Sequence, residues 1–222
     1  MAYGVIDGMR KVLAGIVLSI FGFAANAGQV TIAALGDSLT QGYGLLQQDG
    51  FVPQLQGWLR ARGADVTVIN AGVSGDTTAG GAARVAWTLT PEVDGMIVAL
   101  GGNDLLRGIA PEVSRGNLDR ILAAASQADV DVLLVGMQAP GNYGPEYKAA
   151  FDAIYPELAA EYGTLYEESF FAGIAGDTAD PAEMRKFMQD DGIHPAPEGV
   201  RMIVGVIGPR VLELVRQIEA AQ

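Results

Sequence analysis

The sequence of 222 residues has no cysteine, one histidine and little positive charge. Without cysteine the chain forms no disulfide, thiolate nucleophile or thiolate metal site, and it carries no lipid on a cysteine side chain. The single imidazole, His194, excludes a metal site built from several histidines. With 14 Lys and Arg against 26 Asp and Glu, the net charge is −12. A chain this acidic is unsuited to nucleic acid and to anionic lipid, so we expect neither as a partner.

The sequence begins with a segment typical of an export leader. A basic pair at 10–11 precedes the apolar run 12–23, and the small-residue sequence ANA at 25–27 follows it. This order matches the charged, hydrophobic and cleavage regions of a signal peptide. A transmembrane anchor is the alternative, but crossing a bilayer takes about 20 apolar residues and this run is shorter. We therefore expect residues 1–27 to be a cleaved signal peptide and residues 28–222 to form a single domain.

The predicted leader also sets the expected compartment. We expect a product that is periplasmic in a Gram-negative cell, or secreted, with no stable membrane anchor. Met9 offers a second possible translation start, so the leader begins at Met1 or at Met9. The oligomeric state stays open at this point; nothing in the sequence calls for assembly, and a monomer is the expectation.

Short apolar runs alternate with longer segments of helical spacing through the rest of the chain. Runs such as VTIAAL at 30–35 are apolar at nearly every position, which indicates strands buried on both faces. Alternating strands and helices favour right-handed crossovers and a parallel sheet with helices on both sides. The predicted strands span 30–35, 65–70, 95–100 and 130–137, with a weak fifth at 165–166, and the predicted helices span 51–62, 79–89, 111–128, 146–162 and 197–220.

Polar stretches that contain glycine follow the first three predicted strands. They are GDSL at 36–39, NAGVSGDT at 70–77 and GGND at 101–104, and a fourth stretch, DDGIHP at 190–195, precedes the last helix. Ligands of parallel α/β folds bind beyond the carboxyl ends of the strands. We therefore expect these four stretches to converge on one site.

These stretches supply the parts of an acyl-transfer site. A serine after a strand is most often a helix cap or a turn residue, but Ser38 directly follows a Gly-Asp pair, where a nucleophile would stand above the sheet edge. His194 is the available imidazole base, and Asp191, three residues before it, is placed to orient its ring. Asp190 is a neighbouring candidate for that orienting role. The sequence thus predicts a catalytic triad of Ser38, Asp191 and His194.

A tetrahedral intermediate of acyl transfer also needs hydrogen-bond donors for its oxyanion. The candidates are the backbone N–H groups of Ser38 and Gly75 and the side-chain amide of Asn103. Gly75 lacks a side chain, which permits close approach of a substrate. Taken singly, Gly75 is equally an ordinary turn residue and Asn103 an amide that caps a loop.

Taken together, the four stretches resemble the sequence blocks of the SGNH (GDSL) hydrolase family. The resemblance rests on GDSL at 36–39, SGDT at 74–77, GGND at 101–104 and DGIHP at 191–195, in the family's order over nearly all of residues 28–222. It implies an α/β fold of three layers, α/β/α and flavodoxin-like, with a five-stranded parallel sheet. The G-x-S-x-G elbow of the α/β-hydrolases is absent, so that family is a poor match.

The resemblance also implies a role for each matching residue. Ser38 would be the nucleophile, His194 the base and Asp191 its partner, with Ser38, Gly75 and Asn103 as oxyanion donors. Neither a cofactor nor a metal is implied.

Within the family the chain is most similar to the bacterial group of multifunctional thioesterase I/protease I/lysophospholipase L1 enzymes and arylesterases. The similarity lies in NAGVSGDT, GGNDLLRG, NYG at 142–144 and FMQDDGIHP at 187–195. It implies a serine esterase for carboxylic esters and thioesters, with acyl, aryl or lysophospholipid esters as small-molecule substrates. Arg107 is expected to be a solvated loop charge. Candidates for the wall of the acyl pocket, with ordinary packing as the alternative, are Leu105, Leu106, Ile109, Met137 and Tyr143.

Two other functions remain as alternatives. A carbohydrate O-acetyl esterase of the same superfamily would share the mechanism but prefer acetyl groups. A non-catalytic module would bind a phosphate or nucleotide at a helix N-terminus near residues 36–42. The chain has neither a Walker pattern with its lysine nor G-x-G-x-x-G, which disfavours the binding module.

Overall fold

The computed structural model of the chain describes residues 28–175 and 184–222, together with Met1. Apart from Met1, the signal peptide expected over residues 1–27 lies outside the described residues, so it stays a prediction. In the part of the chain that is described, no helix is both long enough and apolar enough to cross a membrane.

The centre of the fold is a five-stranded sheet in the order β2-β1-β3-β4-β5, in which every neighbouring pair is parallel. The expected α/β class with a five-stranded parallel sheet is confirmed, including the weak fifth strand. The strands are β1 (Val30–Gly36), β2 (Val66–Gly72), β3 (Gly95–Ala99), β4 (Asp131–Val135) and β5 (Leu165–Glu167).

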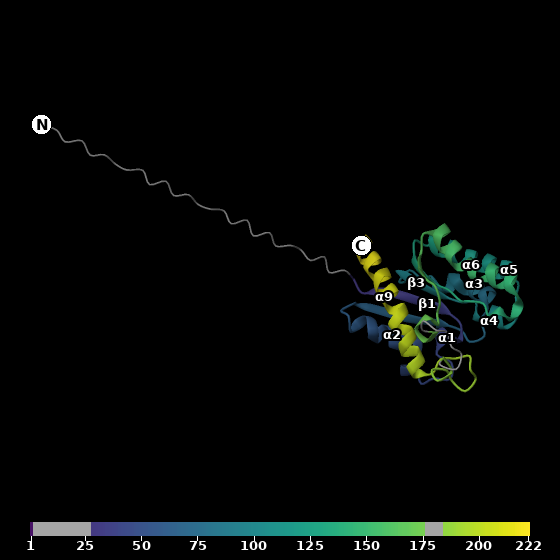
Figure 1. Ribbon diagram of the computed structural model, residues 1–222. Helices are drawn as coiled ribbons and strands as arrows, with labels where there is room; N and C mark the ends of the chain where they lie inside the picture. The colour runs from purple at the N-terminus through teal and green to yellow at the C-terminus, as the bar shows by residue number, and fades with distance from the viewer. Residues whose placement is uncertain (2–27, 176–183) are drawn as a thin grey trace.

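Helices cover both faces of this sheet, as Figure 1 shows, with α2 and α9 on one side and α3, α5 and α6 on the other. Each of the five long helices overlaps a segment predicted from apolar spacing. They are α2 (Phe51–Arg60), α3 (Thr78–Thr88), α5 (Pro111–Gln127), α6 (Pro145–Tyr162) and α9 (Pro197–Ala221). Shorter elements, which the spacing did not predict, are α1 (Ser38–Gln41), α4 (Gly102–Leu106), α7 (Ala172–Ala175) and the 3-10 turns η1 (Gln47–Asp49) and η2 (Gly141–Tyr143).

The apolar character of the strands follows from this covering on both faces. All five residues of β3 are buried, and six of the seven residues of β1 are buried. On the helices the core contacts fall on one stripe; in α9 the buried residues Ile203, Ile207, Val211 and Leu214 recur at helical spacing. The core therefore fixes the sheet, and the strand ends become a rigid base for the loops that follow them.

The carboxyl ends of β2, β1 and β3, which are neighbours in the sheet, lie level with one another. Gly36 at the end of β1 pairs with Gly72 of β2 on one side and with Ala99 of β3 on the other. A Cβ on Gly72 would lie 2.4 Å from the backbone nitrogen of Gln41, so a residue with a side chain does not fit there. This close approach lets α1 cross directly over the end of β2, and it brings the loops after β1, β2 and β3 to one edge.

Candidate active site

Ser38 is the first residue of α1 and lies two residues beyond the end of β1. The helix is capped by Asp37, whose Oδ1 accepts the backbone N–H of Leu39 at 3.0 Å. Tethered in this way to the strand end, Ser38 is partly exposed while its two neighbours on either side are buried. The strand-to-helix junction therefore presents the Ser38 hydroxyl at the carboxyl edge of the sheet.

His194 brings its ring to this hydroxyl from the other end of the chain. Its Nε2 lies 2.9 Å from Ser38 Oγ, and its Nδ1 lies 2.7 Å from Asp191 Oδ2. With the ring proton on Nδ1, the imidazole donates to Asp191 and its Nε2 accepts the hydroxyl proton of Ser38. Asp191, and not its neighbour Asp190, is the carboxylate at Nδ1, although both residues are exposed.

Asp191 is held in place by the loop that it belongs to. Its Oδ1 accepts the backbone N–H groups of His194 at 3.0 Å and Ile193 at 2.9 Å. The backbone N–H of His194, then its ring and then the N–H of Ile193 lower the pKa of Asp191 to about 2. The carboxylate therefore stays ionised at neutral pH, which suits a group that orients an imidazole and stabilises its protonated form.

Contacts from the loop after α1 fix the other side of the His194 ring. The ring of Tyr43 packs against it with centroids 4.7 Å apart. Gln189 joins the two loops, because its Nε2 donates to the carbonyl of Tyr43 and its backbone N–H donates to the carbonyl of His194. Neither Tyr43 nor Gln189 was predicted as a site residue, because neither contact leaves a local spacing signal.

Asp37 is a second carboxyl at the site, and its environment differs from that of Asp191. Its side chain is 1% exposed, and its Oδ2 accepts the amide of Asn103 at 3.3 Å. Burial raises the pKa of Asp37 to about 6, against smaller lowering effects from Leu39, Asn103 and His194. The two carboxyls at this edge therefore differ in charge near pH 5.

The three predicted oxyanion donors lie on adjacent loops of the same sheet edge. Asn103 belongs to α4, directly after β3, and its bond to Asp37 places its amide beside the residue that precedes Ser38. Gly75 lies three residues beyond the end of β2, with a φ of 84°. The backbone N–H of Val73 bonds the carbonyl of Gly36 at 3.1 Å and so joins the loops after β1 and β2.

A cavity of about 630 Å³ opens beside the Ser38 hydroxyl. Four of the five predicted wall residues, Leu105, Leu106, Met137 and Tyr143, line it, whereas Ile109 is not among the lining residues. The Ile109 carbonyl instead accepts the hydroxyl of Tyr147, behind that wall. Lining residues besides these four include Pro140, Asn142, Phe171, Met184, Met188 and Ile193.

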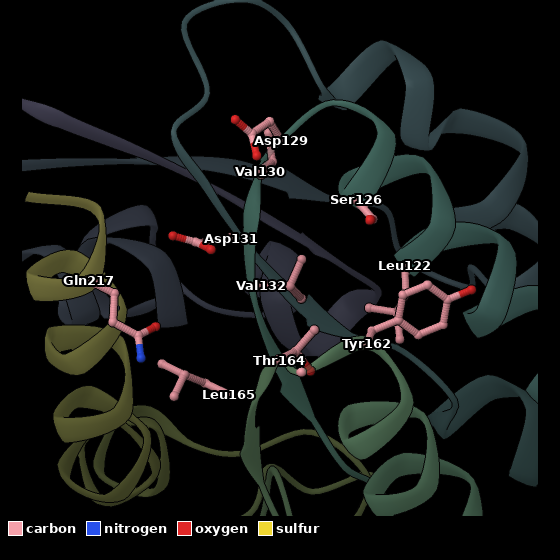
Figure 2. Close-up of a pocket in the computed structure, with 11 residues that line it drawn as sticks. Leu122, Ser126, Asp129, Val130, Asp131, Val132, Tyr162, Thr164, Leu165 and Gln217 are labelled. Atoms are coloured by element: carbon pink, nitrogen blue, oxygen red, sulfur yellow. The ribbon is translucent and has the colours of Figure 1, made fainter. Parts of the chain in front are cut away.

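A second hollow, of about 160 Å³, lies at the opposite end of the sheet, where β4 and β5 begin (Figure 2). Figure 2 shows Gln217 of α9 on one side of it and Tyr162 of α6 on the other, with polar side chains such as Asp131 and Thr164 between. The chain's single histidine is not among its lining residues. Residues 28–175 and 184–222 also hold no group of three or more His, Asp or Glu side chains placed to bind a metal ion.

The chain matches the GDSL-like lipase/acylhydrolase family over residues 34–202. It is 39% identical to esterase TesA of Pseudomonas aeruginosa over 189 residues, which cover 85% of this chain and 90% of the relative. It is 33% identical to an arylesterase of Vibrio mimicus over 204 residues, 90% of this chain and 98% of the relative. Thioesterase 1/protease 1/lysophospholipase L1 of Escherichia coli is 35% identical over 181 residues, 81% and 82% of the two chains.

The structural comparison agrees with the sequence comparison. The crystal structure of TesA matches this fold with a TM-score of 0.74 at 38% identity, over 83% of this chain and 99% of that one. The family match begins within β1, covers the other four strands and includes every predicted site residue. The chain therefore belongs to the GDSL-like lipase/acylhydrolase family and is an ester hydrolase.

Proposed function

We propose that Ser38 is the nucleophile of this hydrolase, His194 its general base and Asp191 the carboxylate that orients the base. Ser38 Oγ attacks the acyl carbon as His194 Nε2 takes the hydroxyl proton, which forms a tetrahedral oxyanion. Collapse of this intermediate expels the alcohol or thiol, which takes the proton from His194, and leaves the acyl group on Ser38. Water then loses a proton to His194 and attacks the acyl carbon. Collapse of this second intermediate breaks the bond to Ser38 Oγ, which takes the proton back from His194, and the acid is released.

The observation that carries this proposal is the 2.9 Å separation of His194 Nε2 and Ser38 Oγ, with Asp191 Oδ2 at 2.7 Å from the other ring nitrogen. A serine hydroxyl is a weak nucleophile until a base within hydrogen-bond reach takes its proton. The backbone N–H of Ser38 and Gly75 and the amide of Asn103 would then receive the oxyanion. Each donor of this kind commonly lowers the barrier by about 3–4 kcal/mol.

A covalent inhibitor tests the nucleophile directly. The protein is incubated with a serine-reactive alkyl phosphonate and then weighed by mass spectrometry. We expect one phosphonyl group on the parent protein, carried by the peptide that contains Ser38, and none on Ser38→Ala, which also loses hydrolysis. Ser126→Ala, at the opposite end of the sheet, is the matched control and should react like the parent. Full hydrolysis by Ser38→Ala would overturn the assignment.

We infer that the substrate carries an acyl chain longer than acetyl, on an oxygen or a sulfur. The cavity beside Ser38 is large enough for such a chain, and its wall includes apolar side chains such as Leu105, Met137 and Met188. A carbohydrate O-acetyl esterase would need little of this space. Rates on p-nitrophenyl esters from acetate to palmitate separate the two, since an optimum at acetate would favour the O-acetyl esterase.

We propose further that residues 1–27 are a cleaved signal peptide and that the enzyme works in the periplasm or outside the cell. The support is the order of basic, apolar and small residues before position 28. Expression of the full chain in a Gram-negative host tests this, with the intact mass measured in the periplasmic fraction. A product that keeps residues 10–27 and stays in the cytoplasm would refute it.

A further inference from the structure

Gly75, in the loop after β2, has open space around its α-carbon. Gly75 has a φ of 84°, and a Cβ built on it would meet no atom nearer than Arg107 Nη2 at 3.8 Å. Packing around the α-carbon therefore does not set its conformation, and glycine itself restricts its backbone less than any other residue. The hydrogen bonds of the loop and any contact on Gly75 itself therefore decide the direction of the Gly75 N–H.

Arg107 makes such a contact. Its Nη2 donates to the carbonyl oxygen of Gly75 at 2.8 Å, and among the described residues this is the hydrogen bond that reaches that carbonyl. The guanidinium keeps its charge at every working pH and donates in a fixed planar geometry. Holding the carbonyl restrains the peptide that follows the Gly75 α-carbon, and because the loop is closed as a turn, this limits the movement of the N–H on the other side.

The position of Arg107 links two of the proposed oxyanion donors. Arg107 is the C-cap of α4, and its backbone N–H bonds the carbonyls of Asn103 and Asp104, both at 3.2 Å. The same short helix therefore carries the side-chain donor, Asn103, and the contact to the backbone donor, Gly75. The separation of these two donors depends on a single element of five residues.

A buried carboxylate fixes α4 to the body of the protein. Asp104 is fully buried and accepts the backbone N–H of Thr78 at 2.8 Å, the Thr78 hydroxyl at 2.6 Å and the Ser114 hydroxyl at 2.9 Å. Thr78 begins α3 and Ser114 belongs to α5. Arg107 therefore ties the Gly75 loop to an anchored element and not to a second free loop.

The remaining contacts of the loop hold its ends. Arg84 donates to Asp76 Oδ2 at 2.6 Å, to the carbonyl of Ala71 at 2.7 Å and to the carbonyl of Gly36 at 2.8 Å. These bonds fix the residues on both sides of Gly75 without reaching Gly75 itself. Within the loop, the Asp76 N–H also bonds the Val73 carbonyl at 3.1 Å and closes a turn around Gly75. The Arg107 bond adds to this turn bond a contact on Gly75 itself.

We propose that Arg107 is a positioning residue of the oxyanion hole, which aligns the Gly75 N–H with the Asn103 amide by bonding the Gly75 carbonyl. The inference rests on the proposed function, because it requires an oxyanion beside Ser38. Arg107 does not touch the reacting atoms, so its loss weakens the alignment of one donor and leaves the nucleophile and the base in place.

The test compares Arg107→Met with Arg107→Lys, which restores a charged donor. Arg115→Met is the matched control, since it also removes one exposed arginine, on α5, where Arg115 pairs with Glu157 and Glu161. The readouts are kcat and KM on p-nitrophenyl butyrate, and inhibition by butylboronic acid and by butanol. The boronate becomes a tetrahedral anion on serine and needs the oxyanion donors, whereas the neutral alcohol occupies the pocket without them.

For Arg107→Met we expect kcat to fall about tenfold, while KM stays within about twofold of the parent. This fall in kcat is smaller than the roughly 100- to 1000-fold fall that loss of an oxyanion donor itself causes. Boronate inhibition should weaken by the same factor, with butanol inhibition unchanged, and Arg107→Lys should recover most of both. Both chemical steps pass through an oxyanion, so kcat reports the effect whichever step limits the rate. Arg115→Met should match the parent.

The proposal is wrong if Arg107→Met keeps the parent kcat, or if boronate and butanol inhibition weaken equally, which would indicate a disturbed pocket. Failure of the proposed function has a separate signature. In that case Ser38→Ala keeps its activity and the parent gains no phosphonyl mass, whatever the Arg107 variants do.

Discussion

Replacing Asp37 with asparagine should change the stability of the protein in a pH-dependent way. The unfolding free energy of the variant, relative to that of the parent, should be higher at neutral pH than at acidic pH. Burial raises the pKa of Asp37 from 3.8 to about 6. Below pH 3.8 the carboxyl is protonated in both the folded and the unfolded chain, so it contributes no pH-dependent difference. Between pH 3.8 and 6 the unfolded chain loses this proton while the folded chain keeps it, so the unfolding free energy falls as the pH rises.

The size of the effect follows from the pKa shift. A shift of about two units corresponds to about 3 kcal/mol above pH 6, at about 1.4 kcal/mol per unit. The asparagine of the variant does not titrate, so this loss is absent there. From about pH 4 to about pH 8 the unfolding free energy of Asp37→Asn should therefore rise by about 2–3 kcal/mol relative to the parent.

Urea denaturation at intervals across this pH range measures the difference. The measured quantity is the difference in unfolding free energy between variant and parent, followed as the pH changes. A lost hydrogen bond to Leu39 or Asn103 that shifts this difference equally at every pH therefore does not affect the result. Thr40→Val is the matched control, because it alters a buried neighbour that does not titrate; its gap to the parent should not change with pH. A gap for Asp37→Asn that is equally constant would refute the argument from burial.

Three further outcomes follow from the structure. Asn103→Ala should lower kcat about 100- to 1000-fold with little change in KM, and a kcat within about threefold of the parent in steady-state assays would remove this amide from the oxyanion hole. Thr40→Val should raise the unfolding free energy by about 1 kcal/mol, because the Thr40 hydroxyl is buried without a hydrogen-bond partner; urea titration showing a loss would contradict this. Phe151→Ala should lower the unfolding free energy by about 3–5 kcal/mol, since this ring is fully buried between α6 and the sheet, and a change under about 1 kcal/mol would speak against the packing described.

Local patterns in the sequence were sufficient for the long elements of the fold. Continuous apolar runs such as 95–100 require burial on both faces, and this is possible only under two helical layers. Helical spacing in segments such as 197–220 requires one buried stripe. Both patterns are consequences of neighbouring residues along the chain, so they can be read without knowing what packs against them.

The pair of Asp191 and His194 was also accessible from sequence, because three residues and a glycine turn bring the carboxylate to the ring within one loop. The partnership of His194 with Ser38 spans 156 positions. It was predicted from the residue types and the expected convergence of the loops at one sheet edge, together with the resemblance to one family, and not from local spacing. Its geometry depends on the level ends of β1, β2 and β3, and no local pattern specifies that register.

What the sequence determined by itself is the class of the fold, its strands and long helices, and the residue types available for chemistry. Tertiary structure decided the partners that lie outside a residue's own loop. Asp37 is buried and Asp191 is not, Tyr43 packs on His194, Ile109 is not among the residues that line the cavity, and the exposed Arg107 bonds the carbonyl of Gly75. The reason is physical: burial and hydrogen bonding depend on atoms brought together through space, whereas spacing along the chain reports only contacts within a single turn, strand or loop.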